Sequence, residues 1–242
     1  MLLFSETEMR GYWPWAHLEA GAYDFIMADP PWRFSLWGRD VPHDQLSDAD
    51  RIASDPELAR IDAICEKIFG TDETEIDRDA HLRKSPQAHY STMTLDDIKR
   101  LPVAGLAAPN CLLWLWATAP MLNKQIDVLE AWGFEFKTSG VWVKTTVNHK
   151  LAFGTGYVLR NSHEPFLIGT RGDPVTTRGV RSAIVEPLIM DQVRKHSEKP
   201  PTAYAAAEAL MPDARRLELF SRTNRKGWDV WGDEAGKFGE AA

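Results

Sequence analysis

The sequence predicts an α/β protein whose central sheet is mostly parallel and carries helices on both faces. Three observations lead to this fold class. Short apolar runs of strand length alternate along the chain with amphipathic segments of helical periodicity, which is typical of β-α-β units. The run Cys-Leu-Leu-Trp-Leu-Trp at 111–116 is apolar throughout, as in a strand buried on both faces. The length of 242 residues is sufficient for one large domain with a substantial core.

The first expected element is a strand at 23–28, and an aromatic segment at 12–17 that we expect to be irregular precedes it. Thr94 is expected to cap a helix that runs to about residue 100. The reason is that an acid, Asp97, follows three residues after this threonine, as in a capping box.

The second half of the chain continues the alternation. A helix is expected over 121–131, where Gly133 stops it and three apolar side chains face inward: Ile126, Val128 and Leu129. The remaining expected elements are strands at 134–144, 165–169 and 215–220, the last clear one, and a helix at 200–210 that Pro200 and Pro201 open.

The composition, 44% hydrophobic and 26% charged, is that of an ordinary globular protein. No apolar run is long enough to cross a bilayer and the N-terminus does not resemble a signal peptide, so no membrane association is expected. Cys65 and Cys111 form neither a disulfide framework nor a metal-ligand spacing, which favours a reducing, cytoplasmic location. His163 and His196 do not form a helical pair of ligands, so we expect no metal site.

Charge is distributed unevenly along the chain. The net charge of −7 argues against a general nucleic-acid coat protein. Residues 38–82 hold 13 acids and 5 bases, which is −8, so the rest of the chain is about +1. Between 136 and 200 there are 10 Lys/Arg and 5 Asp/Glu, which allows a locally basic surface. We interpret about 38–88 as an acidic, helical insertion within a single domain that spans 1–242.

A candidate site begins directly after the first expected strand, with Asp-Pro-Pro-Trp at 29–32. Ligands of open α/β sheets bind at the carboxyl ends of the strands. The two prolines stiffen the turn and remove two backbone donors, which leaves the Asp29 carboxylate and the Pro30 carbonyl as acceptors beside a flat ring. This arrangement suits a planar ligand with N–H donors, such as the exocyclic amine of a base. These four residues alone equally allow a strand-ending turn with a packed tryptophan.

Polar residues also occur at the ends of other expected strands. Lys144 ends one strand, Glu218 lies near the end of another, and His-Ser-Glu-Lys-Pro at 196–200 precedes a helix N-terminus, where anions are favoured. Each of these also has a plain alternative: a surface lysine, a satisfied carboxylate or a helix cap. A P-loop and a Gly-x-Ser-x-Gly elbow are absent from the sequence, and Gly-Thr-Gly at 154–156 lacks the third glycine of a dinucleotide fingerprint.

Further motifs follow in a fixed order along the chain. They include His-Tyr-Ser-Thr-Met at 89–93, Leu-Trp-Leu-Trp-Ala-Thr at 113–118, Val-Trp-Val-Lys at 141–144, Asn-Ser-His-Glu at 161–164, Glu-Leu-Phe-Ser-Arg at 218–222 and Gly-Trp-Asp-Val-Trp-Gly-Asp-Glu at 227–234. Together with Asp-Pro-Pro-Trp, this set resembles the MT-A70-type N6-adenine methyltransferases, which use S-adenosyl-L-methionine. The resemblance covers about 23–32 and 89–234 and implies a Rossmann-like methyltransferase fold. Only 28 residues precede Asp29, which is similar to the permuted order of that family, with the catalytic motif first.

The resemblance implies a role for individual side chains. Asp29 and the Pro30 carbonyl would hold the target amine for direct in-line methyl transfer, with no covalent enzyme intermediate and no metal. The implied catalytic residues are Asp29, Pro30, Pro31 and Trp32. The implied cofactor-binding residues are Asp29, Lys144, His196, Ser197, Glu218, Phe220, Arg222, Asn224, Arg225, Asp233 and Glu234. The implied substrate-binding residues are Trp32, Tyr90, Asn161, Glu164 and Lys199, with Trp32 and Tyr90 stacking on an extruded base.

The partner that the resemblance implies is nucleic acid, and the compact chain without added RNA-binding modules favours DNA over RNA. The same reaction on RNA adenosine and a catalytically silent partner subunit are the alternatives, although the intact tetrapeptide, Lys144 and Glu218 argue against a silent copy. A homodimer and a heterodimer are both open. The sequence departs from the family at Asp233, where Asn is common, and in the acidic insertion, which we expect to pack beside the substrate cleft and shape target choice.

Overall fold

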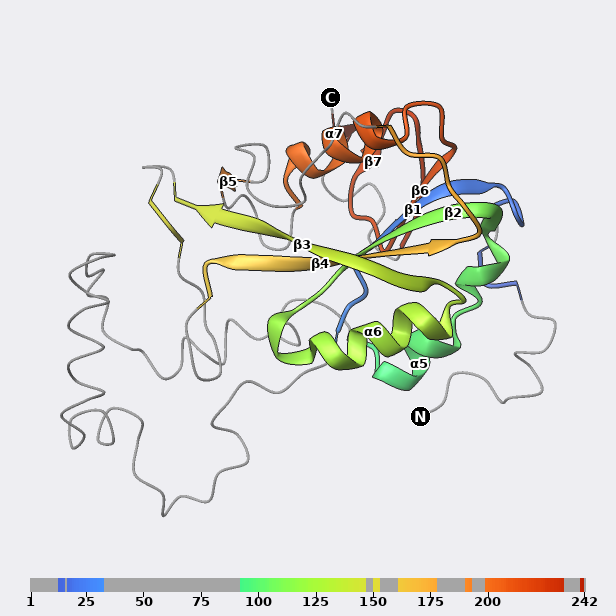
Figure 1. The fold of residues 1–242 in the computed structure, drawn as a ribbon, viewed down its shortest axis with the longest axis horizontal. Coiled ribbons are helices and arrows are strands. Elements are labelled where there is room, and N and C mark those ends of the chain that lie inside the picture. The colour runs from blue at the N-terminus through green and yellow to red at the C-terminus, as the bar shows by residue number, and fades with distance from the viewer. Residues whose placement is uncertain are drawn as a thin grey trace, which may run out of the picture.

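The computed structural model describes residues 13–15, 17–32, 92–146, 150–152, 161–177 and 199–232, together with the backbone of 190–192 and 240–241. These residues form a sheet with helices on both faces, as the sequence predicts. In Figure 1, α5 (Leu95–Arg100) and α6 (Leu122–Ala131) lie below the sheet, and α7 (Pro201–Leu210) lies above it. The acidic insertion expected at 38–88 lies outside the described residues.

The main sheet has seven strands in the order β5-β3-β4-β2-β1-β6-β8. Their bounds are β1 Tyr23–Ala28, β2 Ala107–Trp116, β3 Glu135–Thr145, β4 His163–Arg171, β5 Met190–Gln192, β6 Arg216–Leu219 and β8 Trp228–Trp231. Strand β1 is central and pairs in parallel with both β2 and β6, and the pairs β3·β5 and β6·β8 are also parallel. Only β4 runs antiparallel to its neighbours, β2 and β3. The expected mostly parallel sheet is therefore confirmed for the described strands.

The strands and helices expected within the described residues are all present, with small shifts at their ends. Thr94 caps α5 by accepting a hydrogen bond from the Asp97 amide, and Gly133 follows α6 with a φ of 82°, as a helix stop requires. Two short 3₁₀ helices, Val103–Gly105 and Ala119–Met121, precede β2 and α6.

Two details of the elements were not expected from the sequence. The strand at 215–220 is not the last strand of the main sheet, because β8 follows it in the sequence and pairs with β6. Strand β8 has only four residues and no continuous apolar run, so its sequence does not indicate a strand. In α6 the buried residues include Gln125, while Ile126 is only partly buried. The Gln125 amide is satisfied by Thr118, whose backbone N–H donates to its Oε1 over 2.9 Å.

A second, smaller pairing lies near the C-terminus. Strand β7 (Asn224–Arg225) runs parallel to β9 (Glu240–Ala241). The loop that follows β6 is therefore held by backbone hydrogen bonds as well as by the main sheet.

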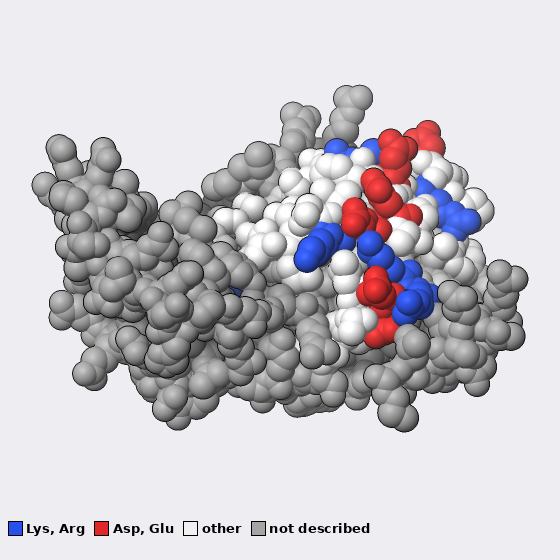
Figure 2. Space-filling model, turned by 90° about the horizontal axis from the view of Figure 1, so that it is seen from below, with Lys and Arg blue, Asp and Glu red and all other residues white. Residues whose placement is uncertain are grey.

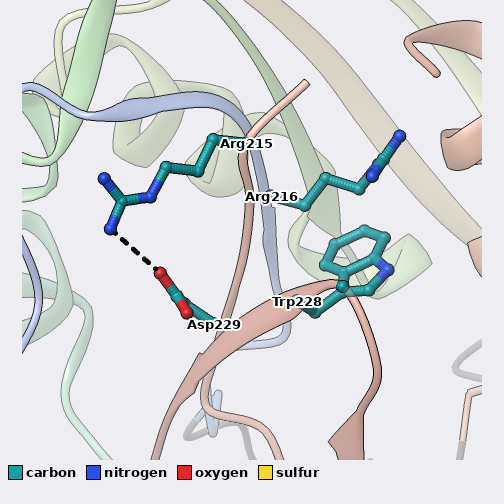
Figure 3. Close-up of a pocket in the computed structure, with 5 residues that line it drawn as sticks. Arg215, Arg216, Trp228 and Asp229 are labelled. Atoms are coloured by element: carbon teal, nitrogen blue, oxygen red, sulfur yellow. Dashed lines mark hydrogen bonds and ion pairs between the residues drawn. The ribbon is translucent and has the colours of Figure 1, made fainter. Parts of the chain in front are cut away.

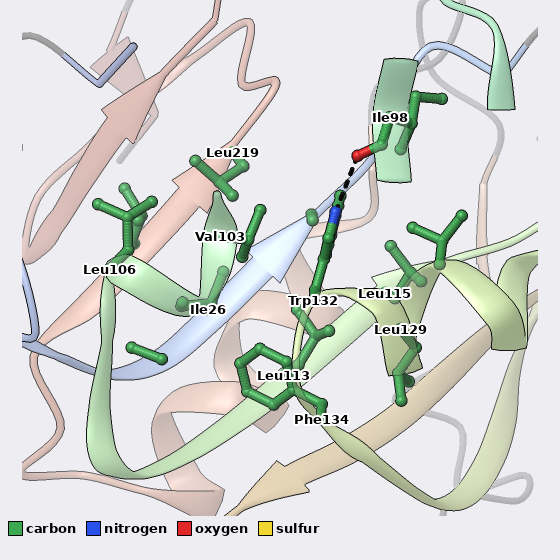
Figure 4. Close-up of a cluster of buried hydrophobic side chains, with 14 of the residues drawn as sticks. Ile26, Ile98, Val103, Leu106, Leu113, Leu115, Leu129, Trp132, Phe134 and Leu219 are labelled. Carbon is green, nitrogen blue, oxygen red and sulfur yellow. Dashed lines mark hydrogen bonds between the residues drawn. The ribbon is translucent and has the colours of Figure 1, made fainter. Parts of the chain in front are cut away.

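The core below the sheet joins α5 and α6 to the central strands. Ile26, Leu113 and Leu115 point from β1 and β2 toward the helices and are fully buried (Figure 4). Trp132, at the end of α6, is also buried, and its indole N–H donates to the Ile98 carbonyl of α5 over 2.8 Å. This one side chain therefore fills the core and connects the two helices.

We expect Trp132→Phe to lower the free energy of unfolding by about 1–3 kcal/mol. The smaller ring leaves unfilled volume, and the Ile98 carbonyl loses its indole donor. Urea denaturation measures the loss. The exposed Glu130 of the same helix provides the control, because Glu130→Gln should change the unfolding free energy by less than about 0.5 kcal/mol. Equal stability of the two variants would contradict the role of Trp132.

The core above the sheet is aromatic. Trp114 stacks on Phe166 with 3.9 Å between ring centroids, and Trp116 packs edge-on against the same ring at 5.5 Å. Helix α7 contributes buried Ala203 and Ala207, whose small side chains permit a close approach to the sheet. The packing thus fixes α7 beside the strand ends where the polar motifs occur. Among the described helices, none is long and apolar enough to cross a membrane.

Candidate active site

The site lies where β1 and β6 end side by side. The register pairs Met27 with Glu218 and Ala28 with Leu219, so the next residues of both strands emerge at the same edge of the sheet. The Asp29 N–H donates to the Leu219 carbonyl over 3.3 Å, which extends the pairing by one residue. Two motifs that are far apart in the sequence therefore meet at the carboxyl ends of parallel strands, where α/β proteins bind ligands.

The turn at 29–32 is held by backbone bonds. The Trp32 N–H donates to the Pro30 carbonyl over 2.8 Å, and the Met93 N–H donates to the Pro31 carbonyl over 2.9 Å. Since the prolines already restrict φ, these bonds leave the turn little freedom. The Asp29 side chain is about one-quarter exposed, so it can still reach a ligand.

The structure corrects the stacking role expected of Trp32. The ring is only 4% exposed and packs in the core below the sheet, and its indole N–H donates to the Trp116 carbonyl over 3.2 Å. A base has no access to either face of a ring that is covered by core side chains. In this arrangement Trp32 supports the turn from beneath, which is the packed-tryptophan alternative that the sequence left open.

Four charged side chains form a continuous chain of ion pairs. Lys199 Nζ lies 2.8 Å from Asp29 Oδ2 and 2.5 Å from Glu164 Oε1, and Lys144 Nζ lies 2.7 Å from Glu164 Oε2. The order is therefore Asp29, Lys199, Glu164 and Lys144, with two positive and two negative charges. Lys199 is the most deeply placed member, with a side chain only 6% exposed. The cluster joins the end of β1, strands β3 and β4, and Lys199, which lies two residues before α7.

Burial and charge affect the four groups differently. Burial works against the charge of Glu164, but Lys199 and Lys144 outweigh it and lower the pKa of this carboxyl to about 2. Burial likewise opposes the charge of Lys199, yet Asp29 and Glu164 raise its pKa above the ordinary value. At Asp29 burial is the largest effect and raises the pKa of the carboxyl. The charge of Lys199 lowers this pKa in part, and the charge of Glu164 raises it further. Lys199 and Glu164 thus stay charged at neutral pH, while Asp29 is the better proton acceptor of the two carboxylates.

Two tryptophans flank the lysines. Lys199 Nζ lies 5.1 Å from the ring centroid of Trp116, and Lys144 Nζ lies 4.7 Å from that of Trp142. The two rings meet edge-to-face at 6.3 Å. Such cation–π contacts favour a desolvated ammonium and restrict its position. The sequence placed Trp116 in a buried strand but contained no sign that it faces the site.

Glu218 forms a second polar centre beside the first. The Tyr204 hydroxyl donates to Glu218 Oε1 over 2.7 Å, and the Ser221 hydroxyl lies 2.9 Å from Oε2. Burial raises the pKa of Glu218, these two hydrogen bonds lower it in part, and the charge of Asp29 raises it further. The register of β1 and β6 brings Glu218 and Asp29 to the same edge of the sheet, so the two centres lie side by side. Phe220 follows with a φ of 65°, a left-handed conformation that turns the chain out of β6.

The Glu164 pKa predicts a pH dependence of stability. Because the pKa in the folded protein is below the ordinary 4.5, the stabilisation is complete above pH 4.5 and is lost as the pH falls toward 2. We expect a loss on the order of 3 kcal/mol across this range. Comparison of wild type with Glu164→Gln by urea denaturation at pH 5, 4 and 3 measures it. The two curves should converge on acidification, and a constant difference between them would contradict the prediction.

Comparison with known proteins agrees with this geometry. A family model described as MT-A70 matches residues 76–234. The chain belongs to the MT-A70 family. Among its relatives, the type II methyltransferase M.MunI of Mycoplasma sp is 30% identical over 213 residues, which are 88% of this chain and 77% of that protein.

Two human relatives match a shorter stretch. The N(6)-adenine-specific methyltransferase METTL4 is 31% identical over 160 residues, which are 62% of this chain and 34% of that protein. METTL3, an N(6)-adenosine-methyltransferase catalytic subunit, is 30% identical over 149 residues, 60% of this chain and 25% of that protein. The chain thus spans about a quarter to a third of these human proteins but most of M.MunI. The MT-A70 family consists of S-adenosylmethionine-dependent N6-adenine methyltransferases, so the resemblance and the Rossmann-like fold are confirmed.

The expected MT-A70 site residues fall into three groups. Asp29, Lys144, Glu164, Lys199 and Glu218 come together, as described above. The half-buried Asn161 and Arg222 lie in connections near these groups, Arg222 acts electrostatically on Asp29, and Asn224 is exposed. Tyr90, His196, Ser197, Asp233 and Glu234 lie outside the described residues, so their roles stay predictions.

The structure places Lys199 differently from what the sequence led us to expect. Lys199 was expected to bind substrate, in a segment before a helix N-terminus where anions such as phosphate are favoured. In the structure it is buried and shared by two carboxylates, Asp29 and Glu164. A buried, doubly paired ammonium cannot reach a phosphate without breaking both ion pairs.

A separate cavity of about 330 Å³ lies at the amino ends of β6 and β8 (Figure 3). It is lined by Arg215, Arg216, Gly227, Trp228 and Asp229. Parallel strands place these residues at the sheet edge opposite Asp29. The Arg215 guanidinium is already paired with Glu19 and Asp229, so it offers little free charge to a ligand.

The face of the molecule that carries α5 and α6 has mixed charge. Figure 2 shows Lys/Arg and Asp/Glu intermingled on its described part. Several of them are paired, as in Lys99 with Asp127 and Arg100 with Asp97. On this face the described residues form no extended basic surface, and five of the ten bases at 136–200 lie outside them: Arg160, Arg178, Arg181, Arg194 and Lys195.

Proposed function

We propose that this chain is an S-adenosylmethionine-dependent methyltransferase that methylates the N6 amine of adenine in DNA. The observation that carries the proposal is the meeting of two acceptor centres, Asp29 and Glu218, at the carboxyl ends of the paired strands β1 and β6. One centre suits an amine substrate and the other suits a ligand with hydroxyl or ammonium donors. Family membership supports the reaction, and the extent of the match to a type II methyltransferase, 77% of its length, supports DNA.

Asp29 and Pro30 would orient the target amine. Each has an acceptor oxygen, and the Pro30 carbonyl keeps a second lone pair after it accepts from Trp32. The lone pair of an adenine amine is delocalised into the ring. Two fixed acceptors on its hydrogens turn that lone pair toward the transferable methyl group, so orientation supplies much of the rate.

Asp29 would also take a proton. A methylated amine carries one hydrogen too many, and a nearby base must accept it. Burial raises the pKa of Asp29, which makes it a better proton acceptor than an exposed aspartate, and Lys199 keeps it in place.

The residues present fit S-adenosylmethionine. When bound, this cofactor supplies an electrophilic methyl group on a sulfonium. Glu218 is a buried carboxylate with two internal donors, so about two of its four lone-pair positions stay open to ribose hydroxyls. Arg222 and Arg225 follow it in the loop and would attract the carboxylate of the amino-acid end. Lys144 would close the same cleft from β3.

Labelled methyl transfer tests the proposal. Purified protein is incubated with S-adenosylmethionine carrying a labelled methyl group and with duplex DNA, single-stranded DNA or RNA, and the methylated nucleoside is identified by mass spectrometry. We expect N6-methyladenine in DNA. Methylation of RNA alone would replace DNA by RNA as the substrate, an outcome that the METTL3 match makes a serious alternative. Cofactor binding without transfer to any of the three would favour a silent subunit.

A further inference from the structure

Tyr204 occupies a position in the site that its sequence context does not reveal. It lies in the alanine-rich first turns of α7 and is only 6% exposed. Its hydroxyl donates to Glu218 Oε1 over 2.7 Å, and burial together with this carboxylate raises the pKa of the tyrosine well above its ordinary value. The phenol therefore stays protonated and remains a donor at every physiological pH.

Of the two hydroxyls that can donate to Glu218, that of Tyr204 has no competing acceptor among the described residues. The Ser221 hydroxyl lies 2.9 Å from Oε2 but also 2.8 Å from the Thr223 carbonyl. A hydroxyl has a single proton, so Ser221 can donate to only one of these acceptors at a time. The orientation of the carboxylate consequently depends chiefly on Tyr204.

The ring of Tyr204 is itself held from two sides. Trp228 packs edge-on at 5.6 Å, and the Arg225 guanidinium lies over the ring with 3.9 Å from Cζ to the centroid. Arg225 belongs to β7, in the loop that follows Glu218. Tyr204 thus contacts both a carboxylate and a guanidinium that are expected to bind the cofactor.

Helix α7 also reaches the other half of the site. Its first residue, Pro201, comes two positions after Lys199, which is paired with Asp29. A span of six residues, 199–204, therefore contacts the amine-binding centre at one end and Glu218 at the other. Ala203 and Tyr204 of this span are buried in the aromatic core above the sheet.

We propose that Tyr204 is a positioning residue that holds Glu218 in the orientation that receives the ribose hydroxyls of the cofactor. The inference rests on the proposed function, in which Glu218 binds S-adenosylmethionine. Tyr204 does not touch the reacting atoms. It aligns the carboxylate and, through Arg225, the loop beside it.

Calorimetric binding of S-adenosylhomocysteine to the full chain between pH 5 and 9 tests this role. We expect Tyr204→Phe to weaken binding roughly tenfold at pH 7, the scale of a hydrogen bond to a charged group. The hydrogen bond from Tyr204 lowers the pKa of Glu218. Its removal should therefore raise that pKa, and the loss of affinity on acidification should begin at a higher pH in the variant.

A matched control exists at the opposite edge of the sheet. The Tyr23 hydroxyl donates to Asp229 Oδ2, also over 2.7 Å, and Arg215 lies over its ring. Tyr23→Phe removes an equivalent tyrosine–carboxylate bond, so it should lower stability in a similar way without changing affinity. A double-mutant cycle adds a second test, because Tyr204→Phe should have little further effect in a Glu218→Leu background, where the acceptor for its hydroxyl is gone.

The possible outcomes distinguish a failure of the positioning role of Tyr204 from a failure of the proposed function. Wild-type affinity and an unshifted acid limb in Tyr204→Phe would overturn the positioning role, and so would an equal loss of affinity in Tyr23→Phe. Additive losses in the double-mutant cycle would show that Tyr204 does not act through Glu218. If the wild type bound no S-adenosylhomocysteine at any pH, the proposed function would fail and the inference with it.

Discussion

Asp29→Asn is expected to reduce the single-turnover rate of methyl transfer by roughly 10²–10³-fold, the cost of removing one preorganised polar group from a catalytic site. Asparagine has almost the same shape as aspartate. It replaces one carboxylate oxygen with an NH₂ group, which cannot accept from the adenine amine, cannot take its proton, and presents a donor to the Lys199 ammonium. The loss should appear in the chemical step, while the affinity for S-adenosylhomocysteine changes much less.

Asp213→Asn is the matched control for this experiment. Asp213 is an exposed aspartate in the turn before β6, at the sheet edge away from the site. The control should keep the wild-type rate. A rate in Asp29→Asn within about threefold of wild type would remove Asp29 from the catalytic assignment, since one lost hydrogen bond already corresponds to a larger factor.

Lys199→Met is expected to have the largest effect on stability, a loss of about 3–5 kcal/mol at pH 7. Methionine fills similar volume but leaves Asp29 and Glu164 to face each other without their shared cation. An uncompensated buried charge costs more than the missing ion pair itself. Methyl transfer should be lost as well, because Asp29 is no longer held in place.

The deficit of Lys199→Met should depend on pH with a definite sign. Without the lysine, burial and mutual repulsion raise the pKa of both carboxyls, so the variant takes up protons at higher pH than wild type. Protonation removes the buried charge, and the difference in unfolding free energy between variant and wild type should shrink on acidification. Thermal or urea unfolding at pH 7 and pH 5 measures this difference.

Two further variants complete the Lys199 experiment. Lys137→Met removes a lysine that forms an exposed ion pair with Glu135, so it should change stability by no more than about 1 kcal/mol. Lys199→Met combined with Glu164→Gln should recover part of the lost stability, since Asp29 then lies beside a neutral amide instead of a second carboxylate. Similar losses for Lys137→Met and Lys199→Met would show that the buried cluster has no special importance.

The order of the helices and of the longer strands was predictable from the sequence, and so was the position of the turn at 29–32. Strand periodicity and caps are local signals: β1 and β2 are apolar runs, and Thr94 and Gly133 mark helix ends. Strand β8 was missed because its four residues become a strand only through pairing with β6. The antiparallel direction of β4 could not be predicted either, because the residues of a strand do not indicate whether its neighbour runs parallel or antiparallel to it.

Some residues of the candidate site were predicted from the sequence, and others were found only in the structure. The sequence predicts Asp29, Lys144 and Glu218 as site residues because they lie at the ends of expected strands and belong to an ordered set of motifs. Tyr204 sits in an alanine-rich helix whose pattern indicates packing alone, and Trp116 sits in a uniformly apolar strand. Their contacts with Glu218 and Lys199 arise only from the packing of α7 on the sheet.

The sequence by itself determined the fold class, the family and the stiff acceptor turn that ends β1, because these depend on residues that are close together in the chain or occur in a fixed order. Only the tertiary structure decided that Trp32 lies in the core, that Lys199 is shared by two buried carboxylates, and that Tyr204 holds Glu218. The exposure and the ion pairs of a side chain depend on which distant segments of the chain pack together, and this packing cannot be read from the residue type at one position.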